Sequence, residues 1–192
     1  MANVKTCDPI QESLEWCEGQ SNFAGIRRRI YFCATQFCVS MPYLPLDESG
    51  RPSSGTVTGS FVMKEGATFK HIDIIPEKSQ ANSTSQGDYP NQTSLDKLVA
   101  VHQGRGAAAS AAVAGLHNCR NVYIVEDIDG RAYIIGFEDA WPAKTTVETD
   151  FGQGPTGTPG TTITVEATNR LPWPEFKGKI VTDLGEIDYS KN

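Results

Sequence analysis

The sequence predicts a mainly β fold, either a β-barrel or an orthogonal β-sandwich, with one α-helix packed on it. Short runs rich in β-branched and aromatic residues recur along the chain, and turns containing glycine or proline separate them. Only one stretch, residues 107–116, is rich in alanine, the strongest helix former. The runs add up to about eight to ten short strands, a pattern typical of antiparallel β folds.

The first strand signals lie in the N-terminal half. Residues 29–33 (RIYFC) alternate in character and carry aromatic side chains. Residues 55–64 and 67–75 are β-branched runs separated by Glu65-Gly66, and a two-residue connection of this kind predicts a β-hairpin. Residues 94–102 fit helical spacing as well as β alternation, and we interpret them as a strand.

Residues 107–116 (AAASAAVAGL) predict the helix, and Gly104-Arg105-Gly106 forms a flexible entry to it. Because alanine side chains are small, such a helix suits close packing on a sheet or against a neighbouring subunit. A helix that is simply buried in the domain core would carry the same residues. We favour the core, and different faces of the helix allow both arrangements.

Residues 122–126 (VYIVE) and 132–137 (AYIIGF) predict a second β-hairpin. The DIDG sequence at 127–130 supplies its turn, with Gly130 suited to a positive φ angle. The same four residues look like the start of a calcium loop. Because the later ligands are missing, we interpret them as a turn alone.

The C-terminal part begins with a segment rich in glycine, proline and threonine, residues 151–160, which predicts a loop. Residues 161–168 (TTITVEAT) alternate strictly, which predicts a strand with one buried face. The prolines of LPWPEF, 171–176, indicate a turn or an edge strand. The last predicted strand is KIVTDL, 179–184.

The chain has 192 residues, and we expect one domain over 1–192, with residues 1–25 as a candidate extended arm. A composition of 39% hydrophobic and 21% charged residues is ordinary for a folded soluble protein. No run approaches the roughly 18 apolar residues of a membrane span, and the N-terminus lacks the pattern of a signal peptide. We therefore expect a chain that folds in a cytoplasm without a membrane partner. The five cysteines form no CxxC pair and are interpreted as reduced thiols.

The charge of the chain argues against a protein that grips nucleic acid. Its formal net charge is −6, and its basic residues cluster only at the three arginines 27–29. Tight binding to DNA or RNA requires a wider basic surface.

The sequence contains no recognisable catalytic or metal-binding pattern. The histidines His71, His102 and His117 are scattered, so each is interpreted as a structural or surface residue. The segment GQGPTG at 152–157 lacks the strand and helix that frame a phosphate-binding loop. We expect no catalytic residue, no cofactor and no metal, and therefore no enzyme.

The order of the elements resembles the tail tube proteins of tailed bacteriophages, above all those of phages and prophages of Bacteroidetes-type hosts. CEGQSNFAGIRRRIYFC (17–33) is similar to the family's opening before a first aromatic strand, and MPYLP (41–45) is similar to its exit. Residues 55–88 resemble paired strands that end in a Gln-Gly step. After the alanine helix, NVYIVEDIDGRAYIIG (121–136) resembles the family hairpin, and TDFGQGPTGTPGTTITVEA (149–167) resembles its glycine-rich segment and following strand. The likeness spans most of the chain.

The resemblance implies a structural virion protein rather than a catalyst. Family members fold as a β-barrel or orthogonal sandwich flanked by a helix, and six copies form a ring. The rings stack into the tail tube of the virion, which assembles in the host bacterial cytoplasm and contacts other tail proteins. DNA passes through the lumen without specific binding. Six copies of a chain with charge −6 carry −36, which would repel the phosphates of the genome.

Two segments are expected to make contacts between subunits or between rings: residues 1–25 and the glycine-rich loop. The alternatives are a frayed terminus and an ordinary solvated loop. The loop residues are Asp150, Phe151, Gly152, Gln153, Gly154, Pro155, Thr156 and Gly157.

Two other functions stay open. A tail terminator or head–tail connector shares the barrel but forms single rings. A carbohydrate-binding β-sandwich would stack sugars on Trp16, Trp141 and Trp173, although the prolines next to the last two favour packing corners.

Overall fold

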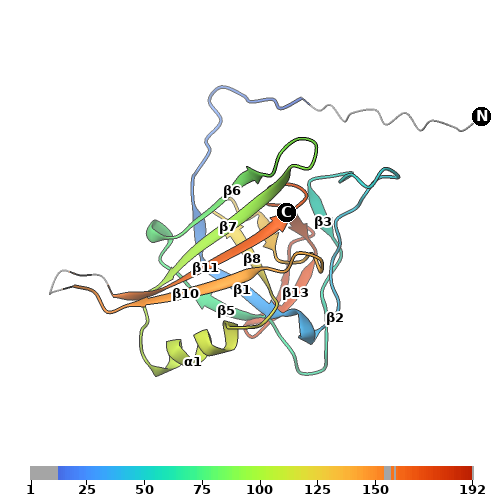
Figure 1. Ribbon diagram of the computed structural model, residues 1–192. Helices are drawn as coiled ribbons and strands as arrows, with labels where there is room; N and C mark the ends of the chain where they lie inside the picture. The colour runs from blue at the N-terminus through green and yellow to red at the C-terminus, as the bar shows by residue number, and fades with distance from the viewer. Residues whose placement is uncertain (1–12, 154–156, 158, 192) are drawn as a thin grey trace, which may run out of the picture.

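The computed structural model describes residues 13–153, 157 and 159–191, and that part of the chain is mainly β with one α-helix (Figure 1). A six-stranded sheet has the order β3-β12-β9-β8-β1-β5. Its strands are, in that order, Thr56–Thr58, Glu175–Lys177, Ala132–Ile135, Asn121–Asp127, Ile26–Ala34 and Lys70–Asp73. A four-stranded sheet has the order β10-β11-β7-β6. Its strands are Lys144–Asp150, Gly160–Asn169, Thr93–His102 and Gln80–Gln86.

Two small ribbons and three helical segments complete the described fold. The ribbons pair β2 with β4 and β13 with β14. Their strands are Cys38–Ser40, Val62–Met63, Lys179–Thr182 and Gly185–Asp188. The α-helix is α1 (Ala107–Leu116), and the short 3-10 helices are η1 (Thr35–Phe37) and η2 (Pro76–Lys78). No helix of the described residues is long and apolar enough to cross a membrane.

The sheets do not close into a barrel. Among the described strands, β3 and β5 end the six-stranded sheet, and β10 and β6 end the four-stranded sheet. The prediction of a mainly β fold with one helix is confirmed, whereas a closed β-barrel is wrong for this chain. In the four-stranded sheet no described strand pairs with the outer side of β10 or β6. In the six-stranded sheet, Thr58 of β3 pairs with Tyr43, and Phe69, just before β5, pairs with Thr182.

Two apolar cores lie on the two faces of the six-stranded sheet. One core joins this sheet to the four-stranded sheet through Ile30, Tyr123, Leu98 and Val165. The other core lies on the opposite face and includes Val122, Ile124, Phe69, Phe176 and Ile180. Strand β8 is therefore buried on both faces, as its uninterrupted run of apolar residues requires.

Several predicted strands are confirmed at their expected places. Residues 29–33 lie in β1, residues 94–102 form β7 rather than a helix, and residues 161–168 lie in β11 with alternating burial. The second hairpin forms between β8 and β9, and its turn has Gly130 at φ +91°. The last predicted strand corresponds to β13.

The predicted hairpin at Glu65-Gly66 is wrong. The run 55–64 is broken at Gly59, which has φ +105°, and it yields β3 and β4 in different sheets. A turn does form between Lys64 and Ala67, but β4 pairs with β2 and β5 pairs with β1. The turn residues determine where the chain reverses direction. They do not determine which strands pair with the segments before and after the turn.

Candidate functional site: surfaces for assembly

Strands β10 and β11 form a long hairpin that projects from the four-stranded sheet, and the described residues of the glycine-rich loop lie at its outer end, the tip (Figure 1). Strands β10 and β11 pair without interruption from Lys144 opposite Glu166 to Asp150 opposite Gly160. Of the eight loop residues predicted to contact other subunits, Asp150 ends β10, and Phe151, Gly152, Gln153 and Gly157 follow it. Gly154, Pro155 and Thr156 lie outside the described residues.

Phe151 is the apolar group that this tip presents. Its side chain is exposed at 71%, and Arg105 holds it from the segment that enters α1. The Arg105 Nη1 donates to the Phe151 carbonyl oxygen at 2.8 Å, and the guanidinium carbon lies 5.6 Å from the ring centroid. The Asp150 Oδ1 accepts from the Gly152 N–H at 2.8 Å, with Gly152 at φ +76°. The Arg105 guanidinium therefore lies over one face of the ring, while most of the side chain stays exposed.

Helix α1 packs only weakly on its own chain. Leu116 is its one buried residue, and Ala109 and Val113 are half-buried. A space of about 250 Å³ remains between the helix and the strands beneath it, lined by Ile72, Ile163 and other side chains. The favoured interpretation, a helix buried in the core, is therefore wrong for most of its surface, because the strands beneath it contact only one narrow stripe.

An isolated helix of this length is marginal in water, so tertiary contacts normally stabilise it. Helix α1 has ten residues and no side-chain cap at its N-terminus. Its exposed surface consists largely of methyl groups from alanine residues. A covering partner would therefore add the apolar contacts that this helix lacks within the described chain.

The free strand edges offer a second kind of contact. Strand β10 is seven residues long and pairs with β11 on one side only, and β6 pairs with β7 on one side only. Unpaired N–H and C=O groups on an edge strand are a template for pairing with another chain. Both edges belong to the four-stranded sheet.

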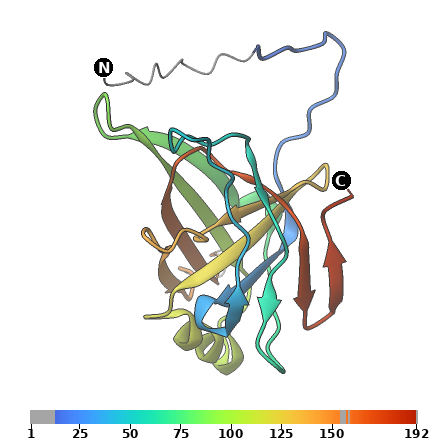
Figure 2. The same cartoon turned by 90° about the vertical axis from the view of Figure 1, so that its right-hand side faces the viewer.

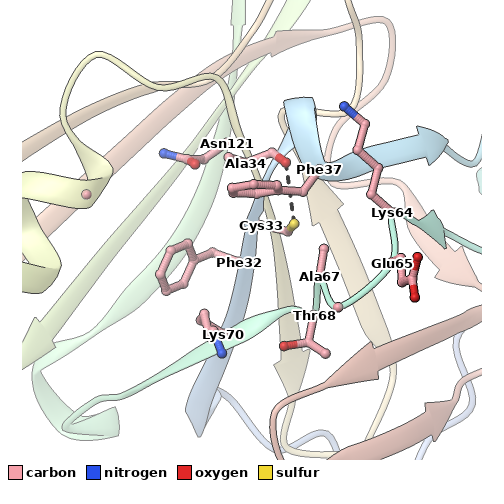
Figure 3. Close-up of a pocket in the computed structure, with 12 residues that line it drawn as sticks. Phe32, Cys33, Ala34, Phe37, Lys64, Glu65, Ala67, Thr68, Lys70 and Asn121 are labelled. Carbon is pink, nitrogen blue, oxygen red and sulfur yellow. Dashed lines mark hydrogen bonds between the residues drawn. The ribbon is translucent and has the colours of Figure 1, made fainter.

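A third feature is an apolar depression of about 490 Å³, named here the β1–β5 pocket, where β5 separates from the end of β1 (Figure 3). Phe32, Phe37 and Ala67 line it, and Lys64 and Lys70 flank it. Figure 3 shows the two lysines on opposite sides of the two aromatic rings. The rings and the lysines together form a depression with an apolar floor and a basic rim.

The arginines at 27–29 are largely paired with carboxylates. Arg27 Nη1 lies 3.0 Å from Glu126 Oε2, and Arg29 Nε lies 2.8 Å from Asp73 Oδ1. The Arg29 guanidinium, as the main cause, lowers the pKa of Asp73. Two of the three positive charges are thus neutralised locally.

The three histidines lie apart in different contacts. His71 Nδ1 is 2.9 Å from Asp183 Oδ1, His102 Nδ1 is 2.7 Å from the Asp73 carbonyl oxygen, and His117 is exposed. Among the residues that the structure describes, no three His, Cys, Asp or Glu side chains gather in a group that could hold a metal ion.

A buried polar cluster surrounds Asp96, and it was not predicted from the sequence. This side chain has no exposed surface, and its Oδ2 accepts from the Asn169 amide and, at 3.1 Å, from the Trp173 N–H. Asp96 Oδ1, Asn169 Oδ1 and Ser83 Oγ are buried and have no hydrogen-bond partner within the described chain. Burial, as the main cause, raises the pKa of Asp96. The signal was present in the alternation of residues 94–102, which places Asp96 on the same face as the buried Leu98.

The tryptophans do not behave alike. Trp173 packs against the core between the sheets, and its Nε1 donates to the Asn82 carbonyl oxygen at 2.7 Å. Trp141 is 41% exposed and Trp16 is 72% exposed. Trp173 therefore serves as a packing corner, as its neighbouring prolines indicated.

Comparisons with known proteins give no relative: no family model, no curated protein and no solved structure matches this chain.

Proposed function

We propose that this chain is a structural subunit of a bacteriophage tail tube, in which six copies form a ring and the rings stack around a lumen for DNA. The proposal combines the order of the sequence motifs with the surfaces that the chain leaves uncovered. Both the projecting hairpin and the free edges of β6 and β10 suit contacts between copies.

The observation that carries the proposal is the exposure of α1. A ten-residue helix with one buried side chain gains little from its own chain, and a neighbouring subunit would supply the missing apolar contacts. The small alanine side chains allow that neighbour to approach closely. An assembly of many copies covers such a surface in every subunit except those at its ends.

The charge of the chain fits a conduit. With −6 on each copy, a ring of six carries −36, and any part of it that faces the lumen repels DNA phosphates. Two arginines of the 27–29 cluster are paired with carboxylates, which leaves little free positive charge there to hold the genome.

We expect the double variant Ala111→Arg/Ala114→Arg to stop assembly while the monomer stays folded. Both residues are exposed and lie one helical turn apart, so two long charged side chains would keep a neighbour away from α1. Negative-stain electron microscopy and light scattering across protein concentrations measure the assembly, and circular dichroism measures the fold. The matched control Ala111→Ser/Ala114→Ser adds little volume and should assemble like the wild type.

The wild-type protein decides between the candidate functions in the same experiment. Stacked rings or tubes with a central hole support the tail tube. Single rings that never stack favour a terminator or connector instead. A uniform monomer at every concentration contradicts the proposal, as does unchanged assembly of the double arginine variant.

A further inference from the structure

We propose that residues 13–25 of one copy, the described part of the N-terminal arm, dock into the β1–β5 pocket of another copy. This inference rests on the proposed stacked assembly and names the contact that links successive copies. Four observations support it: the apolar side chains of the arm, the shape of the pocket, the charges of both, and their positions at opposite ends of the molecule.

The arm exposes large apolar side chains that its own chain does not cover. All residues from 13 to 25 are exposed, among them Leu14, Trp16 and Phe23, with exposed fractions of 101%, 72% and 68%. Exposed apolar groups gathered on one segment indicate a surface that binds a partner. A tryptophan gains much from burial because its ring is large and rigid.

The β1–β5 pocket has the size and lining to accept such side chains. Its volume of about 490 Å³ lies within the range of pockets that bind small organic groups. Phe32 and Phe37 present their rings to it, and Phe37 is 46% exposed. An indole entering between these rings would exchange water for aromatic contacts on both sides.

The charges of the arm and the pocket are complementary. Residues 13–25 contain Glu15 and Glu18 and no basic residue, whereas Lys64 and Lys70 flank the pocket together with a single acidic residue, Glu65. In contrast to the lysines Lys97, Lys177 and Lys179, neither Lys64 nor Lys70 forms an ion pair with a carboxylate of the described residues. Opposite charges that lack local partners favour an encounter between the two surfaces.

The arm and the pocket lie at opposite ends of the molecule. The arm enters β1 at Ile26, and the pocket lies at the other end of the same strand, around Phe32 to Ala34. Both views show the arm leaving at the upper end and α1 and the end of β1 at the lower end (Figures 1 and 2). Nine residues of strand separate them by roughly 26 Å, at about 3.3 Å per residue.

This placement produces a head-to-tail contact. When a donor surface and its acceptor lie at opposite ends, each copy binds the next one and the series continues without closing on a pair. Thirteen extended residues reach at most roughly 45 Å, which is enough to cross from one copy to a neighbour stacked on it.

A peptide of residues 13–25 labelled with a fluorophore tests the binding directly. The acceptor is the full-length chain with Trp16→Ala/Phe23→Ala, in which the protein's own arm no longer competes. We expect saturable binding that weakens as salt is raised, because exposed charge pairs are screened. Adding Lys64→Glu/Lys70→Glu to the acceptor should weaken binding at least about tenfold, since it turns attraction at the rim into repulsion.

The peptide itself supplies the matched controls. A peptide with Trp16→Ala and Phe23→Ala should lose binding, and a peptide with Ser13→Ala and Asn22→Ala should keep it. Equal binding of all three peptides, or no effect of the lysine reversals, would overturn the proposed contact.

Crosslinking shows whether the contact joins two copies. Cys17 is exposed on the arm, and Thr68→Cys places a thiol beside the pocket. Under mild oxidation with oxidised glutathione, which accepts the two electrons of the new disulfide and is itself reduced, we expect ladders of linked chains. The control Glu148→Cys, an exposed position on β10 away from the pocket, should give none. A disulfide within one chain, seen as a compact monomer without ladders, would overturn the exchange between copies.

The two proposals fail separately. Tubes that form normally with Lys64→Glu/Lys70→Glu would overturn the arm contact and leave the tail tube standing. Arm-dependent pairs or ladders from a protein that never forms rings would overturn the tail tube and leave the contact standing.

Discussion

Replacing Asp96 with alanine is expected to lower the free energy of unfolding by about 2–5 kcal/mol. The Asp96 Oδ2 accepts from the Asn169 amide and the Trp173 N–H, and both donors are left without an acceptor in the variant. Each unsatisfied buried donor costs about 1–3 kcal/mol. The variant also loses the link between β7 and the segment that joins β11 to β12. Bonds from Trp173 to the Asn82 carbonyl oxygen and from Arg170 to the Gly50 carbonyl oxygen still hold that segment.

The conservative variant Asp96→Asn is expected to have the opposite effect at neutral pH. The amide oxygen would still accept from Asn169 and Trp173. In the wild type, Asp96 Oδ1, Asn169 Oδ1 and Ser83 Oγ have no hydrogen-bond partner within the described chain. The amide nitrogen of the asparagine would replace the first of these acceptors with a donor for the other two. It would also remove a buried charge. We expect a gain of about 1 kcal/mol at pH 7.

The difference between Asp96→Asn and the wild type should depend on pH. Burial raises the pKa of Asp96 above its value in the unfolded chain, so the folded protein holds this proton more tightly. The corresponding stability is fully present below the unfolded pKa, near about 3.9, and is lost as pH rises through the folded pKa. The asparagine does not titrate. The free energy of unfolding of the variant should therefore rise relative to that of the wild type from about pH 4 upward.

Urea unfolding of the wild type and both variants between pH 4 and pH 7 measures these differences. The pH effects of the other carboxylates cancel in the comparison, because all three chains share those groups. An alanine variant as stable as the wild type would show that the cluster contributes nothing. An asparagine variant whose stability relative to the wild type falls as pH rises would contradict the pKa direction.

Gly178→Ala is expected to cost about 3 kcal/mol or more, or to prevent folding. A Cβ at this position would overlap the carbonyl oxygen of Gly59 and lie 2.9 Å from the Phe176 ring. Gly178 follows β12 and Gly59 follows β3, and these two strands pair in parallel, so the two backbones lie against each other here. Because Phe61 and Phe176 follow and precede this contact and pack in one core, separating the two segments opens that core.

Gly115→Ala is the matched control. It makes the same change of one methyl group inside α1, where nothing lies within 4 Å of the new Cβ. Alanine is favoured over glycine in a helix by up to about 1 kcal/mol, so this variant should be slightly more stable. Thermal unfolding of the two variants beside the wild type gives the comparison. A Gly178→Ala variant that melts at the same temperature as the wild type would show that the close approach at Gly178 does not matter.

The candidate assembly surfaces were partly visible in the sequence. The glycine-rich segment could be predicted as a loop because its glycine, proline and threonine residues fit neither the helical nor the β-strand spacing of apolar residues. The exposure of α1 could not, because alanine is equally common in a core and at a close interface. The β1–β5 pocket gave no signal, since Phe32, Phe37 and Lys70 come together only where β5 leaves β1.

In the four-stranded sheet, the inner strands could be predicted from their local pattern and the edge strands could not. Residues 94–102 and 161–168 alternate because one face of β7 and β11 meets the core. The edge strands β6 (QANSTSQ) and β10 (KTTVETD) are mostly polar and could not be predicted from their own pattern, because a strand exposed on its outer side needs few apolar residues. Only the family resemblance of residues 55–88 included the segment of β6. The two edge strands form because β7 and β11 offer them hydrogen-bonding partners.

By itself, the sequence determined the mainly β class, the helix at 107–116, the hairpin after it and the alternating strand at 161–168. Each depends on the propensities and spacing of residues that are close along the chain. The tertiary structure alone decided that β4 and β5 find different partners, that the sheets stay open, that Asp96 is buried and that α1 is exposed. These outcomes depend on which distant segments compete for the same edge or the same core, and local periodicity carries no information about that competition.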